Sequence, residues 1–388
     1  MVNEDKATRY HRLRRRASVL GTLTQTLGLL LLLASGASVL LRDAVVAKVG
    51  HGFMSMVTIY VVAVAVILDI CNLPWAFYTG VTLERRYGLS TESKARWWIN
   101  HLKASALALV FSVAAALIVL SLARWSPERW WMLAAVVFTV ILVALAQLAP
   151  VVLLPIFYEV KPLTRESLRD RLLSLAERAG AQVLGVFEWR LSERTRKANA
   201  ALAGLGRTRR ILVSDTLLAD HTDDEIEVIL AHELAHHVHH DIWTAIAVEA
   251  VLVGLGFYLA DAALIRFGAA LDLNGKGDVA GLPLLVLAGG AASLALLPIV
   301  NALSRAHERR ADRYALDLTR NPSAFIAAMK RLAAQNLAEE RPSLLVRLLF
   351  STHPSTSARI EAAKRWSMRN ASGLSELSRA HDELASHL

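Results

Sequence analysis

Residues Val19–Leu41 read VLGTLTQTLGLLLLLASGASVLL, a run of 23 residues without a charged side chain. At about 1.5 Å per helical residue this run is roughly 34 Å long, enough to cross the hydrocarbon core of a bilayer. Five more stretches have the same apolar character: Phe53–Phe77, Ala104–Leu122, Trp130–Tyr158, Ile242–Leu264 and Leu282–Ser304. The sequence therefore predicts a mainly α-helical, polytopic membrane protein with about six transmembrane helices. Asp69, Glu249 and Asp261 lie inside these stretches, where they indicate either interfacial helix ends or a polar cavity.

The composition narrows the function classes. Of the 388 residues, 54% are hydrophobic, and the formal net charge is +9. This apolar share excludes a disordered chain, and the single cysteine excludes an intrachain disulfide or a metal site built from several cysteines. The basic balance comes without any nucleic-acid-binding motif, so no nucleic-acid partner is expected.

The positive charges have a strongly uneven distribution along the chain. Of the 43 Lys and Arg residues, 37 fall in segments 1–18, 78–103, 159–241 and 305–388, which alternate with the predicted spans. The positive-inside rule then places both termini and the two long polar segments in the cytoplasm, in a bacterial inner membrane or a eukaryotic endoplasmic reticulum. The basic start followed by an apolar run also fits a cleavable signal peptide.

This pattern divides the chain into consecutive parts. We expect a basic N-terminal segment at residues 1–18, four transmembrane helices at 19–158 and a polar cytoplasmic region at 159–241. A transmembrane hairpin at 242–304 and a cytoplasmic helical segment at 305–388 follow. The polar region 159–241 is predicted to hold one helix and two strands, at residues 163–179, 183–189 and 210–214. Thr222 and Glu225 form a capping-box pattern, which predicts the start of a further helix that continues through His240.

His232-Glu233-Leu234-Ala235-His236 lies on that helix. Residues four apart share a helix face, so the two imidazoles can converge on one cation, and Glu233 stands close enough to take a proton from a metal-bound water. Zinc needs a third protein ligand, and Glu308 is the best candidate because the hairpin 242–304 returns it to the side of the histidines. Asp312 follows one turn later and could orient a ligand histidine.

An ordered series of motifs surrounds this pattern and resembles the type I CAAX prenyl endopeptidases, integral-membrane zinc proteases of the gluzincin kind, with HtpX-type proteases as relatives. The motifs are Leu73-Pro74-Trp75 with Tyr78 and Glu84, Pro155-Ile156-Phe157, Lys161-Pro162-Leu163, Asn199-Ala200, Arg210-Ile211-Leu212-Val213, Asp215-Thr216-Leu217-Leu218, the HExxH helix, Ser304-Arg305 with Glu308 and Asp312, and His353-Pro354 with Arg359. The resemblance implies a zincin-like α+β metalloprotease domain on the cytoplasmic side of the helices. It also implies one Zn²⁺ held by His232, His236 and Glu308, with Glu233 as general base.

The resemblance implies roles for five further residues. Asn199 and Ala200 match an edge strand that pairs with an extended substrate, a form of β-augmentation. His353 matches a histidine that binds the developing oxyanion, and Asp312 and Arg359 match residues that support the metal ligands. Taken alone, Asn199 could be a turn residue and His353 a helix-capping group.

The substrate-facing region departs from the family pattern. Arg194-Thr195-Arg196-Lys197 precedes the Asn-Ala pair, Ala201 follows it, and Ser355 replaces a second proline after His353. Prenyl specificity therefore stays open. The expected partners are the bilayer and either lipidated C-termini or membrane proteins awaiting disposal, the latter as in HtpX-like quality control. An alternative of another class is a non-catalytic zinc-binding receptor or transporter, which would have no need of Glu233.

Overall fold

The computed structural model describes residues 5–148, 152, 154–204 and 209–386, and the chain divides into two compact units. The helical unit comprises residues 10–146 and 243–297. The mixed unit comprises residues 1–9, 147–242 and 298–388.

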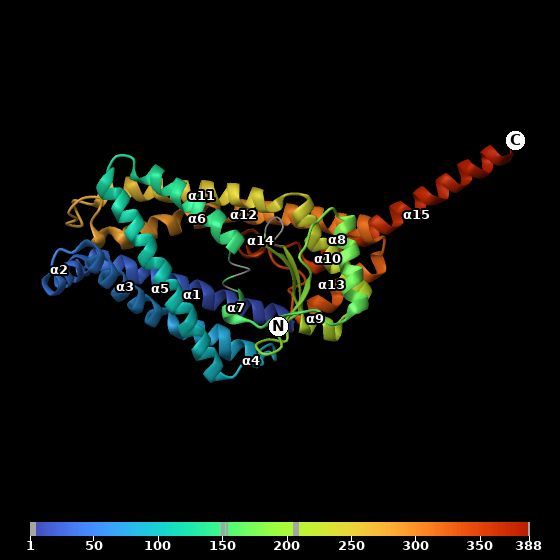
Figure 1. Cartoon of the computed structure of the whole chain (residues 1–388), viewed down its shortest axis with the longest axis horizontal. Coiled ribbons are helices and arrows are strands. Elements are labelled where there is room, and N and C mark those ends of the chain that lie inside the picture. Colours follow the sequence, from blue (N-terminus) through green and yellow to red (C-terminus); the bar gives the residue numbers. More distant parts are fainter. Residues whose placement is uncertain (1–4, 149–151, 153, 205–208, 387–388) are drawn as a thin grey trace. The chain divides into compact units, whose positions relative to one another are not determined.

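Long helices make up the helical unit (Figure 1). The helices that lie in it or run into it are α1 (Lys6–Ala34), α2 (Ala37–Val49), α3 (Phe53–Phe77) with the π-helix η1 (Tyr78–Leu83) and α4 (Glu84–Arg86), α5 (Lys94–Trp125), α6 (Trp130–Leu148), α11 (Asp241–Phe267), the 3₁₀ turn η4 (Val279–Gly281) and α12 (Leu282–Thr319). Five stretches of the described chain are helical, long and apolar enough to cross a membrane, and the apolar α6 is shorter. The predicted mainly α-helical chain with several membrane-length helices is thereby confirmed.

One predicted span has the wrong bounds. The run 19–41 is not one helix, because α1 ends at Ala34 and Gly36 adopts φ +72°, a left-handed conformation that glycine reaches without steric cost. The predicted span 130–158 contains α6, which is described as far as Leu148, and the short helix α7 (Leu154–Phe157), and residues 149–151 and 153 lie outside the described residues.

The three acids of the predicted spans have different surroundings. Asp261 is buried, and its Oδ1 lies 2.6 Å from both Nε1 of Trp130 and Nζ of Lys276. Asp69 accepts a hydrogen bond from Ser105 at 3.3 Å. Glu249 lines a largely apolar cavity of about 500 Å³ within the helical unit. Of the two readings of these acids, a cavity position therefore fits Glu249.

A four-stranded sheet forms part of the mixed unit. Its strands are β1 (Val160–Pro162), β2 (Val186–Trp189), β3 (Ala200–Ala203) and β4 (Arg210–Ser214), in the spatial order β1-β2-β4-β3. The pair β2–β4 is parallel, and the other two pairs are antiparallel. Strand β3 is therefore an edge of this sheet among the described residues. The predicted strand at 183–189 is shorter than expected, and the strand at 210–214 is confirmed.

Helices pack beside this sheet and carry the core of the unit (Figure 1). They are α8 (Glu166–Arg178), α9 (Asp215–Asp220), α10 (Asp223–Val238), α13 (Pro322–Gln335) and α15 (Thr356–Ser386). Helix α14 (Leu344–Phe350) also belongs to this unit but has no buried residue. The helix predicted at residues 163–179 is confirmed as α8, and its Leu168, Leu172 and Leu175, which share one face, are fully buried. The capping box of α10 is also confirmed: Thr222 and Glu225 exchange side-chain-to-backbone hydrogen bonds.

Candidate metal centre

Helix α10 presents the two motif histidines on one face. The ring centroids of His232 and His236 lie 5.1 Å apart, with the rings nearly perpendicular. His232 is buried and His236 is half-buried. Because the capping box fixes where α10 begins, the position of both side chains along the helix is set by local sequence.

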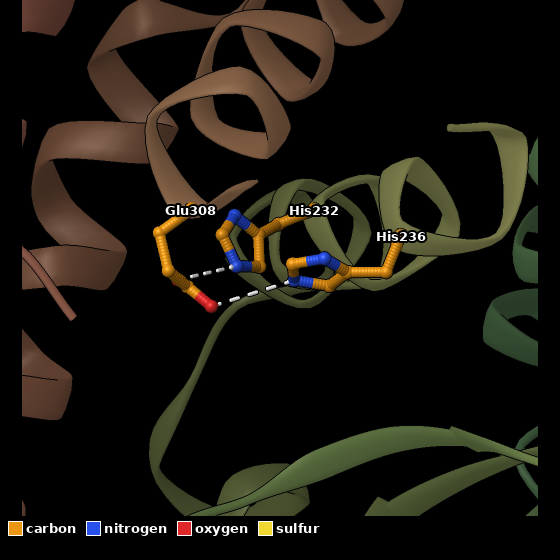
Figure 2. Close-up of side chains that lie close together, drawn as sticks. All are labelled: His232, His236 and Glu308. Carbon is orange, nitrogen blue, oxygen red and sulfur yellow. Dashed lines mark ion pairs between the residues drawn. The ribbon is translucent and has the colours of Figure 1, made fainter. Parts of the chain in front are cut away.

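Glu308 of α12 completes a cluster with the histidines, and Figure 2 shows its carboxylate beside both rings, with a dashed line to each. Its Oε2 lies 3.2 Å from Nε2 of His232, and its Oε1 lies 3.5 Å from Nε2 of His236. One ligand atom from each residue lies within 4.8 Å of the others. The structure therefore brings together the three residues predicted as metal ligands, from two elements distant in sequence.

This donor set fits a zinc ion. Two imidazole nitrogens and a carboxylate are zinc ligands, and ligands about 2.0–2.1 Å from a tetrahedral centre are roughly 3.3 Å apart, close to the distances above. The buried Oε2 of Glu308 has no aligned hydrogen-bond donor among the described residues. Burial alone lowers the pKa of His232, but Asp312 and Glu308 raise it to about 9, so these carboxylates stabilise a positive charge there.

Glu233 follows His232 on α10 and is half-buried. Burial raises the pKa of its carboxyl group, and the nearby His232 and His236 partly oppose this effect. A carboxylate with a raised pKa is a stronger base than an ordinary surface glutamate, which suits a group that accepts a proton and passes it on.

The predicted supporting residues Asp312 and Arg359 lie beside His232. Oδ1 of Asp312 is 3.0 Å from Nδ1 of that histidine. Arg359 of α15 holds the carboxylate in place, donating from Nε to Oδ2 at 2.9 Å and from Nη2 to Oδ1 at 2.5 Å. A hydrogen on Nδ1 leaves the lone pair on Nε2, which faces Glu308, so this contact selects the tautomer that can bind a metal.

Asp241 plays the equivalent part for His236, and sequence reasoning missed it. Its Oδ2 lies 2.8 Å from Nδ1 of His236, and Arg310 of α12 pairs with its other oxygen. Helix α10 was predicted to continue through His240, but it ends at Val238, and His240 adopts φ 58°. This turn places Asp241 at the start of α11, next to the ligand. His240 itself is exposed and does not extend the ligand face of α10.

His353 and the Asn199-Ala200 pair complete the set of predicted residues. Nδ1 of His353 lies 2.8 Å from Oε2 of Glu308, and its side chain is 61% exposed. Asn199 precedes β3, where its backbone exchanges contacts with Ser214, and Ala200 is the first residue of that edge strand. Strand β3 packs against α10, the helix of the histidines.

Comparisons with known proteins agree with this site. Residues 162–367 match peptidase family M48, and residues 3–159 match the family described as CAAX prenyl protease N-terminal, five membrane helices. All the residues placed at the metal centre lie in the first of these segments.

Individual relatives point the same way. The chain is 30% identical over 340 residues to the uncharacterized metalloprotease YhfN of Bacillus subtilis (strain 168), covering 86% of this chain and 79% of YhfN. It is 30% identical to the probable CAAX prenyl protease 1 of Schizosaccharomyces pombe, over 64% of this chain and 53% of that protein. It is 32% identical to a protease HtpX homolog of Campylobacter concisus, over 40% of this chain and 59% of that protein.

The crystal structure of S. mikatae Ste24p has the same fold, with a TM-score of 0.81 at 21% identity, covering 92% of this chain and 87% of that chain. The resemblance predicted from the sequence is therefore confirmed, and the protein is a membrane metallopeptidase similar to CAAX prenyl proteases and HtpX proteases. The chain belongs to peptidase family M48.

Proposed function

We propose that this protein is a zinc endopeptidase that cleaves extended peptide segments close to the membrane. The observation that carries the proposal is the convergence of His232, His236 and Glu308 with Glu233 on the same helix as the histidines. Metal binding alone needs only the three ligands, whereas hydrolysis also needs a base beside them. The comparisons give no support to a non-catalytic receptor or transporter.

The residues divide the chemistry between them. When bound, zinc would acidify a water molecule and polarise the scissile carbonyl. Glu233 takes the proton of the attacking water and passes it to the leaving amine. His353, exposed beside Glu308, donates a hydrogen bond to the substrate oxygen as negative charge develops on it. Asp312 and Asp241 hold the two imidazoles in the tautomer that leaves Nε2 free.

Strand β3 is suited to bind the substrate backbone. Ser214 donates its amide to the carbonyl of Asn199, so in this antiparallel ladder the backbone groups of Ala200 and Leu202 point away from β4. At Ala198 the outward groups are already taken, since the side chain of Asn336 bonds both its amide and its carbonyl. An added substrate strand would therefore pair from Ala200 onward.

The substrate class follows from the location. With several membrane-length helices in the chain, accessible peptides lie near the bilayer, either lipidated C-termini or membrane proteins. We favour a cleavage site on the cytoplasmic side, because 37 of 43 basic residues lie in segments on that side of the predicted topology. Quality control of the HtpX kind is the second candidate, favoured by the changed residues 194–197 before the edge strand.

The test is Glu233→Gln in full-length detergent-purified protein, with Glu177→Gln on the exposed face of α8 as the matched control. Glu233→Gln is expected to retain zinc, measured by metal analysis, and to lose about 10²–10⁴-fold in peptide cleavage. Unchanged cleavage in this variant would refute the mechanism. Matched prenylated and unprenylated peptides separate the two substrate classes: strict dependence on the prenyl group excludes general quality control.

A further inference from the structure

Helix α14 (Leu344–Phe350) has an apolar surface that the described residues leave exposed. Its sequence is LLVRLLF, yet none of its residues is buried. Leu344 is 60% exposed, Leu345 69%, Leu349 36% and Phe350 46%. Contiguous apolar surface of this kind marks a site of interaction with a membrane, a ligand or another protein.

The carboxyl end of α14 is fixed to α12. Asn301 donates to the carbonyl of Leu348 at 2.9 Å, and Arg305 donates to the carbonyls of Arg347 and Ser351 at 2.6 Å each. Asn301 and Arg305 are both buried. These bonds satisfy carbonyls that a helix end leaves without partners, so the position of α14 against this part of α12 is well determined.

This attachment point is the place where α12 changes from apolar to charged. From Leu282 to Ser304 the helix carries no charged residue, and Arg305 is the first. Ile299, two residues before Asn301, is 65% exposed, as expected for a side chain that faces lipid. The residues that hold α14 therefore lie at the level where the span meets the membrane surface.

We propose that α14 lies in the headgroup region of the bilayer and inserts its leucines between the lipid chains. At 3.6 residues per turn, Leu344, Leu345, Leu348 and Leu349 fall within roughly 140° of one face, and Arg347 lies outside that arc. An interfacial helix combines such an apolar face with a basic side chain that reaches the lipid phosphates. The occupant of this surface is phospholipid, continuous with the lipid around α12.

This contact has a consequence for the metal centre. His353 follows α14 by three residues and touches Glu308. A helix held on one side by Asn301 and Arg305, and on the other by lipid, fixes the start of the segment that carries His353.

The test measures lipid contact directly. In a Cys71→Ala background, which removes the one native thiol, Leu345→Cys and Leu349→Cys are labelled with an environment-sensitive fluorophore. The full-length protein is placed in phosphatidylcholine nanodiscs, with one copy per disc and, in a second preparation, two copies per disc. Lipids with a nitroxide near the headgroup are expected to quench both labels, and aqueous iodide to quench them weakly. Leu184→Cys is the matched control: this leucine is 60% exposed and precedes β2 in the mixed unit, and its label should respond to iodide and not to the lipid nitroxide.

Three results would overturn the proposal. Iodide could reach positions 345 and 349 as freely as position 184, which would mean that water covers α14. Shielding without lipid quenching would mean that another segment of this chain covers it. Shielding that arises only with two copies per disc would assign the surface to a second copy.

Discussion

Both units bury carboxylates, but they give them different partners. In the helical unit, Asp278 lies 2.5 Å from Arg42 and also accepts backbone hydrogens from Asn274 and Ala280. In the mixed unit, the carboxylate of Glu308 faces ring nitrogens of three histidines, and its Oε2 has no aligned donor in the described part of the chain.

The different partners of the two carboxylates indicate different roles: Asp278 stabilises the fold, and Glu308 is available to bind a ligand. Asp278 has a cationic partner and a full set of donors, so nothing remains for a ligand to bind. Around Glu308, histidines are held by further carboxylates so that their lone pairs converge. A buried carboxylate that faces the ring nitrogens of histidines, each held in turn by another carboxylate, is a site for a metal ion.

Removing Glu308 is the strongest test of whether this cluster binds a metal ion. Glu308→Gln should abolish stoichiometric zinc binding. Because metal polarisation contributes several kcal/mol to the transition state, kcat/KM should fall about 10³-fold or more. Metal analysis and peptide cleavage measure the two effects. A variant that keeps zinc at wild-type affinity would show that Glu308 is not a ligand.

Removing Asp278, the partner of Arg42, should lower the stability of the protein and leave zinc binding unchanged. Asp278→Ala removes the buried partner of Arg42 and leaves only its ion pair with the exposed Asp43 at 2.8 Å. The cost should therefore be smaller than the about 3–5 kcal/mol of a buried charge that loses every partner. We expect a marked loss of thermal stability in detergent, with zinc content unchanged in the protein that stays folded. Replacing Arg42 by Met in the same chain should restore part of the loss. No recovery in the double variant would show that the backbone contacts of Asp278 dominate.

The residues that orient the histidines should have an intermediate effect. Asp241→Asn and Asp312→Asn should each weaken zinc binding about 10–100-fold, since the tautomer of one ligand is no longer fixed. Competition with a chelator measures this affinity independently of catalysis. Arg310→Met should weaken it less than Asp241→Asn, because Arg310 acts on His236 only through Asp241. An equal loss in both variants would mean that the arginine itself is required.

Much of this arrangement could be predicted because it depends on local sequence. The capping box of Thr222 and Glu225, the HExxH pair and the hydrophobic stripe of α8 each involve residues less than three turns apart. Glu308 was predicted through the hairpin topology and Asp312 through its position one turn later. Arg359 and His353 were predicted through the family resemblance.

Asp241 and the first span were missed for conformational reasons. The pairing of Asp241 with His236 depends on the positive φ of His240, and the histidine-rich sequence indicated a longer helix instead. An aspartate five residues after the second ligand was the available signal. In the first span, hydropathy counts apolar residues but does not register that Gly36 turns the backbone into the left-handed region.

His221 differs from both Asp278 and Glu308. It is a buried titratable group whose ring nitrogens have neither an ion-pair partner nor a cluster of metal ligands beside them among the described residues. It is 5% exposed, and neither of its ring nitrogens has a hydrogen-bond partner among the described residues. Burial lowers the pKa of its imidazole below the ordinary value of 6.5. The native state therefore resists protonation that the unfolded chain accepts.

The lowered pKa of His221 in the native state gives the smallest of the expected effects, a change in how stability depends on pH. The unfolded chain binds the extra proton as the pH falls through about 6.5, so the contribution of neutral His221 to stability is complete above that pH and is lost below it. Thermal unfolding of the wild-type protein and of His221→Gln, measured from pH 8 to pH 5.5, should show a shallower decline in the variant. Because the comparison uses the slopes, a uniform destabilisation by the glutamine does not matter. Parallel curves would show that His221 titrates normally in the fold, and that burial alone does not keep a partnerless group neutral here.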